Sequence, residues 1–485
     1  MVKRYKYFFF FFLFLVLFFL PRYLAHSQYD ALEDEILAID NNMIYSASEQ
    51  LLAPDFTHPP LWYLLMEYPT KLLALEHGIG YYRSIQVLIL FFGLVFSTGY
   101  FWRKIPHKFI LIFLLLFLTN VELIHLTSQH RMYSLVLSFG VFYALYWFYL
   151  IKYKKDKKWQ DFFTVGIIAS LGFFTNYSMI WLIPIFPIAY LISSESEILK
   201  LRIKNLFIFT ITFFVSISWF IPTFIKNSLI SINANQWTFD FNIYNVFQLF
   251  VNYFGIIPVQ KDLGKISIYA VVFIVILVLI VLGQLFLNKE NSIKRIFFTS
   301  AISFIFFLLT VFITGNSLLY PRTAICLVLA FYVLITCAFG SFKYSRVLVF
   351  LIAMLQLSQF LLYFNQDDSF SNGYFFMDYR IHPIHYFVDY NFPQKSCLVV
   401  IPVWNYRATK YFLEDVVQVK SASIFEVEDS IKFSKTKDCA SFYFLEQFSI
   451  GESRLKQQYK KFLPFDIERV LLDEHENQKL YLMSD

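Results

Sequence analysis

The sequence predicts an all-α polytopic membrane protein of about eleven transmembrane helices, followed by a small C-terminal α/β domain. Three observations predict this fold class. Hydrophobic residues make up 58% of the 485 residues and charged residues only 16%, a balance that points to the membrane. Long apolar runs recur through the first part of the chain, with basic residues confined to short clusters between them. Residues 366–485 lack such runs.

The predicted transmembrane segments are the apolar runs that are long enough to cross a bilayer. They lie near residues 5–20, 84–101, 109–126, 134–151, 162–175, 177–192, 206–225, 267–287, 296–314, 323–340 and 347–364. The fifth and sixth runs are short and are separated only by Thr175 and Asn176. They predict either a tight helical hairpin of two spans or a re-entrant pair.

The loops between these runs predict the orientation, because cytoplasmic loops carry an excess of Lys and Arg. Basic clusters begin at Lys3, Arg103, Lys152, Lys200, Lys289 and Lys343, in every second loop. We therefore expect the N-terminus inside and the chain in the cytoplasmic (inner) membrane. Residues 1–365 form the predicted transmembrane domain, with outer loops at 21–83 and 226–266. Residues 366–485 form the predicted extracytoplasmic domain.

The first apolar run also fits a cleavable signal peptide, because it follows a basic start and precedes a weak small-residue site. We favour an uncleaved first helix. Both interpretations place the residues after Pro21 outside the cytoplasm.

The tail from residue 366 reads as a small folded α/β module. Residues 397–404 and 441–447 are strand-like, residues 406–415 are helical in pattern, and a basic helix and a final strand follow. Cys397 and Cys439 lie in this tail and could pair if it faces an oxidising compartment. Two free thiols are the equally open alternative.

The first outer loop carries the best candidate for a catalytic base. Glu33, Asp34 and Glu35 are adjacent there, and a partly desolvated carboxylate can accept a proton from an attacking hydroxyl. A solvated acidic loop is the alternative. Further along the loop, the prolines after His58 impose a fixed turn before a helix that suits the membrane interface.

Five segments in order carry a family resemblance: LEDEI, HPPLWYLL, TSQHRMYSLVLSFG, LGFFTNYSMIWLIP and YPRTAICLVLAFYVL. Together they resemble the membrane glycosyltransferases of the GT-C superfamily, specifically the bacterial relatives of protein O-mannosyltransferase and of the lipid A aminoarabinose transferase. The resemblance covers residues 1 to about 365. Each segment is weak alone, and their order with the expected topology is what makes the resemblance specific.

The resemblance implies a catalytic residue and a reaction. It identifies Asp34, with Glu35 beside it, as the base of an inverting transfer in which the lipid phosphate is the leaving group. A cation in low dielectric would stabilise the charge that this phosphate gains. Arg131 and Arg322 are the candidates, because they interrupt outer loops that are otherwise nearly free of basic residues. Interfacial arginines that reach lipid headgroups are the alternative.

The chain departs from the family pattern before the fourth helix. Relatives often carry a Glu where this chain has Gln129. Glu122, His125 and Gln129 share one face of the predicted third helix, so Glu122 could take the acidic role. A hydrogen-bonded helix contact is the alternative.

The candidates for substrate binding are chosen by residue type and position. They are His58, Tyr133 and Glu122. With 33 Tyr and 62 Phe in the chain, no single aromatic residue stands out as a sugar-stacking group.

Several function classes are disfavoured by what the sequence lacks. It shows no Gly-rich phosphate loop and no nucleotide-sugar domain, which favours a lipid-linked donor. It shows no nucleic-acid footprint and no strong metal constellation. We expect no cofactor, although the acidic triplet at Glu33–Glu35 could hold a divalent cation.

These observations predict an inverting glycosyltransferase that moves a sugar from a polyprenyl-phosphate carrier to a protein, lipid or glycan acceptor outside the membrane. A polytopic transporter or lipid flippase is one alternative; it would show charged pairs at mid-depth and repeated broken helices. A polysaccharide polymerase or ligase is the second, although such proteins usually keep their large outer loop late in the chain.

Overall fold

The computed structural model describes most of the apolar part of the chain and the strands of its tail. The described residues are 2–27, 59–66, 79–192, 198–225, 283, 291–314, 324–340, 345–364, 392–393, 396–401, 418–421, 441–447, 469–475 and 478–483. They belong to two compact units, one of helices and one that contains a five-stranded sheet. The sides of the membrane on which the predicted outer segments lie stay a prediction.

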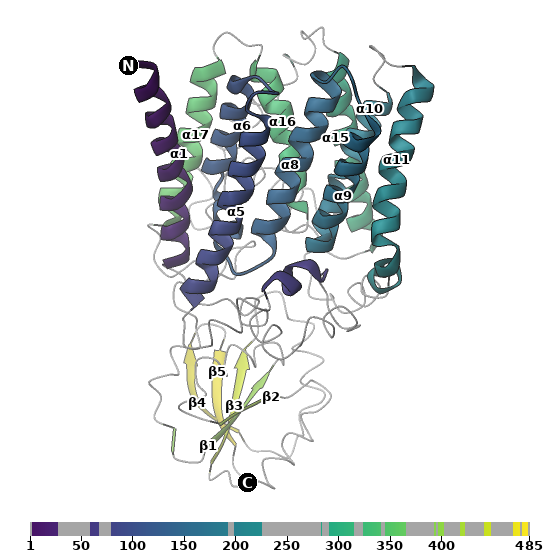
Figure 1. The fold of residues 1–485 in the computed structure, drawn as a ribbon. Helices are drawn as coiled ribbons and strands as arrows, with labels where there is room; N and C mark the ends of the chain where they lie inside the picture. Colours follow the sequence, from purple (N-terminus) through teal and green to yellow (C-terminus); the bar gives the residue numbers. More distant parts are fainter. Residues whose placement is uncertain are drawn as a thin grey trace. The chain divides into compact units, whose positions relative to one another are not determined.

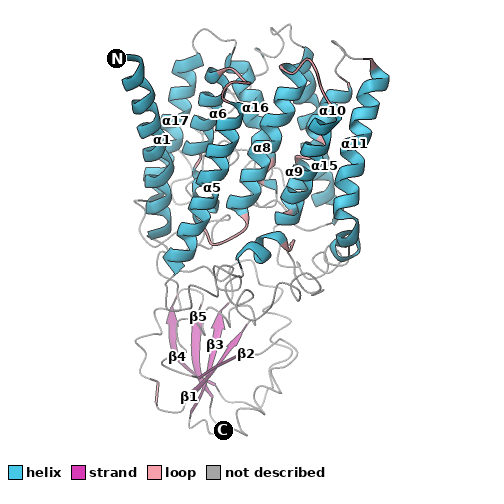
Figure 2. Cartoon of the chain, viewed as in Figure 1, coloured by secondary structure: helices cyan, strands magenta, loops and turns pink. Residues whose placement is uncertain are grey.

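The helical unit is a bundle whose helices run side by side (Figure 1). Its described helices are α1 (Val2–Ser27), α5 (Ile79–Phe101), α6 (His107–Thr119), α7 (Val121–Ser128), α8 (Tyr133–Lys152), α9 (Trp159–Thr175), η1 (Tyr177–Trp181), α10 (Ile185–Leu191), α11 (Leu199–Ile217), η2 (Ser218–Phe220), α15 (Asn291–Thr314), α16 (Leu327–Gly340) and α17 (Ser345–Phe364). A further short helix covers residues 61–66. Along the sequence, all described strands follow the described helices. Figure 2 distinguishes helices and strands by colour.

The described helices make the chain a multi-pass membrane protein. Among the described residues, four helices are long and apolar enough to cross a membrane, and the bent pair α6–α7 supplies a fifth. Several shorter apolar helices accompany them. Ten of the predicted runs coincide with described helices, whereas the run at 267–287 lies outside the described residues apart from Gly283. The total of eleven spans therefore stays a prediction.

Helix α8 forms the centre of the described bundle. The most apolar stretch of α8 is 83% buried inside the protein. The corresponding stretch of the helix from Leu199 to Ile225 is only 28% buried, so most of its residues lie on the outside of the bundle. On α8, Trp147 contacts the rings of Phe162, Tyr190 and Phe209, with centroid separations of 5.4–5.9 Å. Aromatic side chains thus fill the core between α8, α9, α10 and α11.

Small residues let neighbouring helices approach closely, as is common in membrane bundles. A Cβ on Gly93 of α5 would overlap the side chain of Ser138 on α8. A Cβ on Gly166 of α9 would lie 2.8 Å from the Cβ of Thr212 on α11. These two glycines therefore set the separation of α5 from α8 and of α9 from α11.

The predicted third helix, 109–126, is not continuous, which corrects the sequence-based expectation. It breaks at Asn120 into α6 and α7, whose axes differ by 67°. Gln129 lies beyond the end of α7, with extended backbone angles. Glu122 and His125 are three residues apart within α7 and so still share a face, and Gln129 Nε2 lies 2.7 Å from His125 Nε2; only the continuity of the predicted helix is wrong. The physical reason is that the side chain of Asn120 accepts a hydrogen bond from Leu123 N and starts a new helix.

The predicted sixth run, 177–192, is also broken. Asn176 ends α9 and caps η1 by accepting a hydrogen bond from Ser178 N at 2.8 Å. The chain then turns before α10, which has only seven residues. Tyr143 donates to the carbonyl of Ile183 in this turn, and Ser303 donates to that of Trp181. This run therefore consists of a short 3-10 helix, a turn and a short α-helix, and the choice between a two-span hairpin and a re-entrant pair stays open.

The tail contains a mixed five-stranded sheet in the order β2-β1-β3-β5-β4. Its strands are β1 (Ser396–Ile401), β2 (Gln418–Ser421), β3 (Ser441–Gln447), β4 (Arg469–His475) and β5 (Gln478–Met483). β1 pairs in parallel with β2 and β3, and β5 pairs antiparallel with β3 and β4. The predicted strand runs coincide with β1 and β3, whereas the expected single final strand is the hairpin β4–β5. The predicted helices of the tail lie outside the described residues.

The four cysteines of the chain differ between the two units. Cys326 and Cys337 are buried free thiols in the helical unit. Cys397 on β1 is disulfide-bonded. Cys439, the remaining cysteine of the sequence, lies outside the described residues.

We expect Gly93→Val to lower the midpoint of thermal unfolding in detergent, because overpacking a close helix contact costs about 1–3 kcal/mol. Gly99→Val is the matched control: it lies on the same helix, and a Cβ there would meet no atom within 4 Å. Equal midpoints for the two variants would contradict the close approach of α5 to α8.

Candidate functional site

A buried polar cluster surrounds the turn between α7 and α8. It draws side chains from α1, the helix at 61–66, α5, α7 and the turn itself. Its members include Arg22, Trp62, Gln86, Thr127, His130 and Arg131, and each of these side chains is 3% exposed or less. Polar groups buried in a membrane bundle are costly and mark candidate functional positions.

Arg22 joins α1 to the end of α7. Its Nε donates to Thr127 Oγ1 at 3.0 Å, and its Nη1 donates to the carbonyl of Phe18 at 3.1 Å. The guanidinium also lies 4.5 Å from the centre of the Phe18 ring. Thr127 in turn accepts at its carbonyl oxygen from Ser134 Oγ of α8, at 3.0 Å. Arg22 thus ties α1 to the C-terminal end of α7, where a positive charge is favourable, and Ser134 ties the same end to α8.

His130 occupies the centre of a second group of contacts. Its Nδ1 lies 3.4 Å from Gln86 Nε2 on α5, and Gln86 Oε1 accepts from Trp62 Nε1 at 3.2 Å. The rings of Trp62 and Tyr82 lie 5.1 and 5.0 Å from the imidazole. These contacts fix the turn that carries the neighbouring Arg131.

The turn itself is compact. Arg131 N donates to the carbonyl of Gln129 at 2.8 Å. Gln129 Nε2 lies 2.7 Å from His125 Nε2. The side chain of Arg131 is 3% exposed, so it does not extend to the lipid surface as an interfacial arginine would. The guanidinium is instead held inside the protein.

Two of the buried side chains of the cluster are arginines, Arg22 and Arg131. Arg83 of α5 and Glu122 of α7 are buried as well. Guanidinium groups bind carboxylate or phosphate oxygens with paired hydrogen bonds, and low dielectric strengthens that attraction. These arginines are therefore candidates for contact with an anionic group, of the protein or of a ligand.

The structure describes three of the seven predicted site residues. Arg131, Tyr133 and Glu122 are all buried on one continuous segment, 121–133. Asp34, Glu35, His58 and Arg322 lie outside the described residues. The roles given to all seven residues stay predictions.

Sequence reasoning missed Arg22, Gln86 and His130 as members of the cluster. Arg22 was placed just past the first apolar run, yet α1 continues through Pro21 to Ser27. A charged residue at the end of a long apolar run was the available signal. Nothing in the sequence pointed to Gln86, because its importance comes from its contacts with Trp62 and His130.

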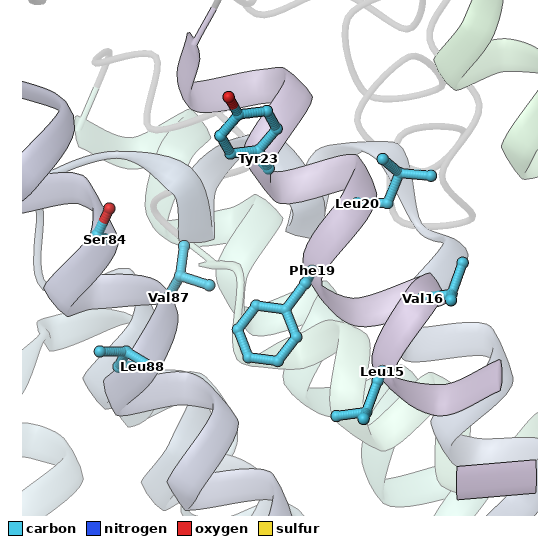
Figure 3. Close-up of a pocket in the computed structure, with 8 residues that line it drawn as sticks. All are labelled: Leu15, Val16, Phe19, Leu20, Tyr23, Ser84, Val87 and Leu88. Atoms are coloured by element: carbon cyan, nitrogen blue, oxygen red, sulfur yellow. The ribbon is translucent and has the colours of Figure 1, made fainter. Parts of the chain in front are cut away.

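A separate apolar groove of about 580 Å³ lies between α1 and α5. Figure 3 shows its lining, with Tyr23 and Ser84 toward one end and aliphatic or aromatic side chains along the rest. No charged side chain lines it. The groove therefore offers a surface for hydrocarbon, and the polar chemistry belongs to the cluster around the α7–α8 turn.

The described residues contain no group of three or more His, Cys, Asp or Glu side chains that could hold a metal ion. The acidic triplet at 33–35 lies outside them.

Comparison with known proteins identifies the fold. No protein-family model matches the chain, and no curated protein matches its sequence. Its structure is similar to the crystal structure of ArnT from Cupriavidus metallidurans bound to undecaprenyl phosphate, with a TM-score of 0.55 over 97% of both chains. This chain has the same overall fold as ArnT. The fold predicted from the sequence resemblance is confirmed, and at 10% identity the likeness concerns the fold alone.

We expect Thr127→Val to destabilise the helical bundle by about 1–3 kcal/mol, because a buried guanidinium nitrogen loses its acceptor while the side-chain shape is kept. Thr98→Val is the control, since the Thr98 hydroxyl bonds within its own helix, to the carbonyl of Leu94. Thermal unfolding in detergent measures the difference. A Thr127 variant as stable as the Thr98 variant would show that the bond to Arg22 contributes little.

Proposed function

We propose that the protein is an inverting glycosyltransferase that moves a sugar from a polyprenyl-phosphate carrier to an acceptor hydroxyl. One observation carries the proposal: the chain is similar along 97% of its length to ArnT, which was crystallised with undecaprenyl phosphate. The buried guanidinium groups around the α7–α8 turn support it, because a phosphate head group is the anion that such a donor brings to the site.

The proposed reaction needs one base and one cationic partner. The carboxylate of Asp34, with Glu35 beside it, takes the proton from the acceptor hydroxyl. The acceptor oxygen then forms a bond to the anomeric carbon from the face opposite the phosphate. The bond between that carbon and the phosphate oxygen breaks, and the lipid phosphate leaves with the electron pair. Inversion at the anomeric carbon follows from this single displacement.

Arg131 and Arg322 are assigned to the phosphate. The negative charge of the phosphate increases as the bond breaks, so a fixed guanidinium stabilises the transition state more than the ground state. The burial of Arg131 supports this role, because no water competes for its hydrogen bonds. His58, Tyr133 and Glu122 are assigned to binding of the sugar and the acceptor.

The proposed location is the outer face of the cytoplasmic (inner) membrane, with the N-terminus inside. The alternation of basic loops supports this orientation. The disulfide of Cys397 supports an extracytoplasmic tail, because disulfides persist on the oxidising side of a membrane. The proposed reaction uses a bound lipid donor and no organic cofactor.

The decisive experiment incubates the purified protein with a panel of radiolabelled polyprenyl-phosphate sugars and follows release of the sugar. We expect Asp34→Asn to lower turnover about 100-fold or more, as loss of a general base does. Near-wild-type turnover would remove Asp34 from the mechanism. The same assay with a chelator tests whether the acidic triplet holds a divalent cation. A protein that releases no sugar but moves lipid across liposomes would be a flippase.

We expect Arg131→Ala to lower kcat/KM for the donor about tenfold or more, because a charged hydrogen bond to the phosphate in the transition state is worth about 1.5–3 kcal/mol. Arg131→Lys should recover only part of the loss, since lysine cannot bind two phosphate oxygens in the same plane. Arg103→Ala removes an exposed arginine from the turn after α5 and serves as the control. Equal donor kcat/KM values in the Arg131 and Arg103 variants would contradict the assignment.

A further inference from the structure

We infer that a buried hydrogen-bonded group at the α6–α7 break positions the donor site. The group consists of Thr119, Asn120, Tyr332 and Gln356, and it is called the Asn120 network below. The inference rests on the proposed function, because it concerns how Arg131 is held for the donor phosphate. None of the four residues is assigned to contact substrate; they are positioning residues.

The network joins three separate helices. Asn120 Nδ2 donates to the Tyr332 hydroxyl of α16 at 2.5 Å. Thr119 Oγ1 donates to Gln356 Oε1 of α17, also at 2.5 Å. Tyr332 and Gln356 are hydrogen-bonded to each other as well. All four side chains are 1% exposed or less.

Asn120 uses both ends of its side-chain amide. Its Oδ1 accepts from Leu123 N at 3.0 Å and so caps the first turn of α7. Its Nδ2 is bonded to Tyr332. A planar amide that is held at both ends connects the start of α7 rigidly to α16. We therefore infer that α16 and α17 determine the direction of the 67° bend between α6 and α7.

The membrane environment makes this control effective. No water is available inside the bundle to replace a lost partner, so each alternative arrangement of α7 leaves polar groups unsatisfied. Hydrophobic side chains of similar size would fill the same space without specifying a direction. A polar network selects one arrangement among several that pack equally well.

The bend is important because α7 leads directly to the donor site. An eight-residue helix is about 12 Å long, so a rotation of about 10° at its start moves its far end by about 2 Å. Thr127, which holds Arg22, lies at that far end, and Arg131 follows in the next turn. A displacement of about 1 Å can cost a reaction about 100-fold. The Asn120 network thus determines whether Arg131 meets the phosphate.

Tyr332→Phe tests the inference, because it removes one hydroxyl and keeps the ring that packs on Phe113. Tyr143→Phe is the matched control: Tyr143 is equally buried, and its hydroxyl donates to the carbonyl of Ile183 at 2.6 Å, in another part of the bundle. Both variants lose one buried hydroxyl group together with its hydrogen bonding. They differ in whether that bond holds α7.

Two measurements are made on each variant in detergent. The first is hydrogen–deuterium exchange of peptides from residues 121–128, without substrate. We expect exchange there to become at least about tenfold faster in Tyr332→Phe than in Tyr143→Phe. The second is the kinetics of sugar release. We expect the donor KM to rise several-fold in Tyr332→Phe only, whereas simple loss of folded protein would lower kcat at constant KM.

The outcomes separate the two proposals. If Tyr332→Phe matches Tyr143→Phe in both measurements, the Asn120 network has no positioning role. If residues 121–128 exchange faster while the donor KM is unchanged, the network holds α7 but does not position the donor, and the inference is overturned. If the wild-type protein releases no sugar but Tyr332→Phe loosens α7, the control of the bend stands and the proposed function fails.

Discussion

The absence of water inside the bilayer is the constraint on which the rest of this structure depends. A helix that breaks there must find partners for its free backbone groups within the protein. Asn120 and Asn176 solve this problem in the same way, because each accepts a hydrogen bond from an amide of the helix that begins after it. Side chains from other helices satisfy further groups nearby. Each break is therefore also a point at which distant parts of the chain are joined.

The candidate site uses one of these breaks. α7 departs by 67° from the direction of α6 and ends at the buried turn that contains His130 and Arg131. Arg22 supports α7 from α1, and Gln86 supports the turn from α5. A guanidinium held in this way has lost its hydration before any ligand arrives. Binding an anion then costs it little further desolvation, which favours a phosphate over a neutral group.

The chain shares the fold of ArnT at only 10% sequence identity, so the arrangement of the helices is similar although most side chains differ. Helix order and length survive such divergence because many apolar side chains satisfy the bilayer equally well. Specific contacts such as that of Arg22 with Thr127 depend on two particular residues and carry no such tolerance. The shared fold therefore accounts for the arrangement of the helices, and the chemistry of the proposed site depends on the chain's own polar residues.

The sequence by itself determined the membrane class, the positions of most described helices, two strands of the tail and the GT-C fold. Apolar length and the order of the five segments are local properties, so they can be read without contacts. It did not reveal the break within 109–126, because hydropathy averages over an asparagine that caps a new helix. It also missed Arg22, Gln86 and His130. Only the tertiary structure could decide these points, since the role of a polar residue in a membrane depends on the hydrogen-bond partner that another helix supplies.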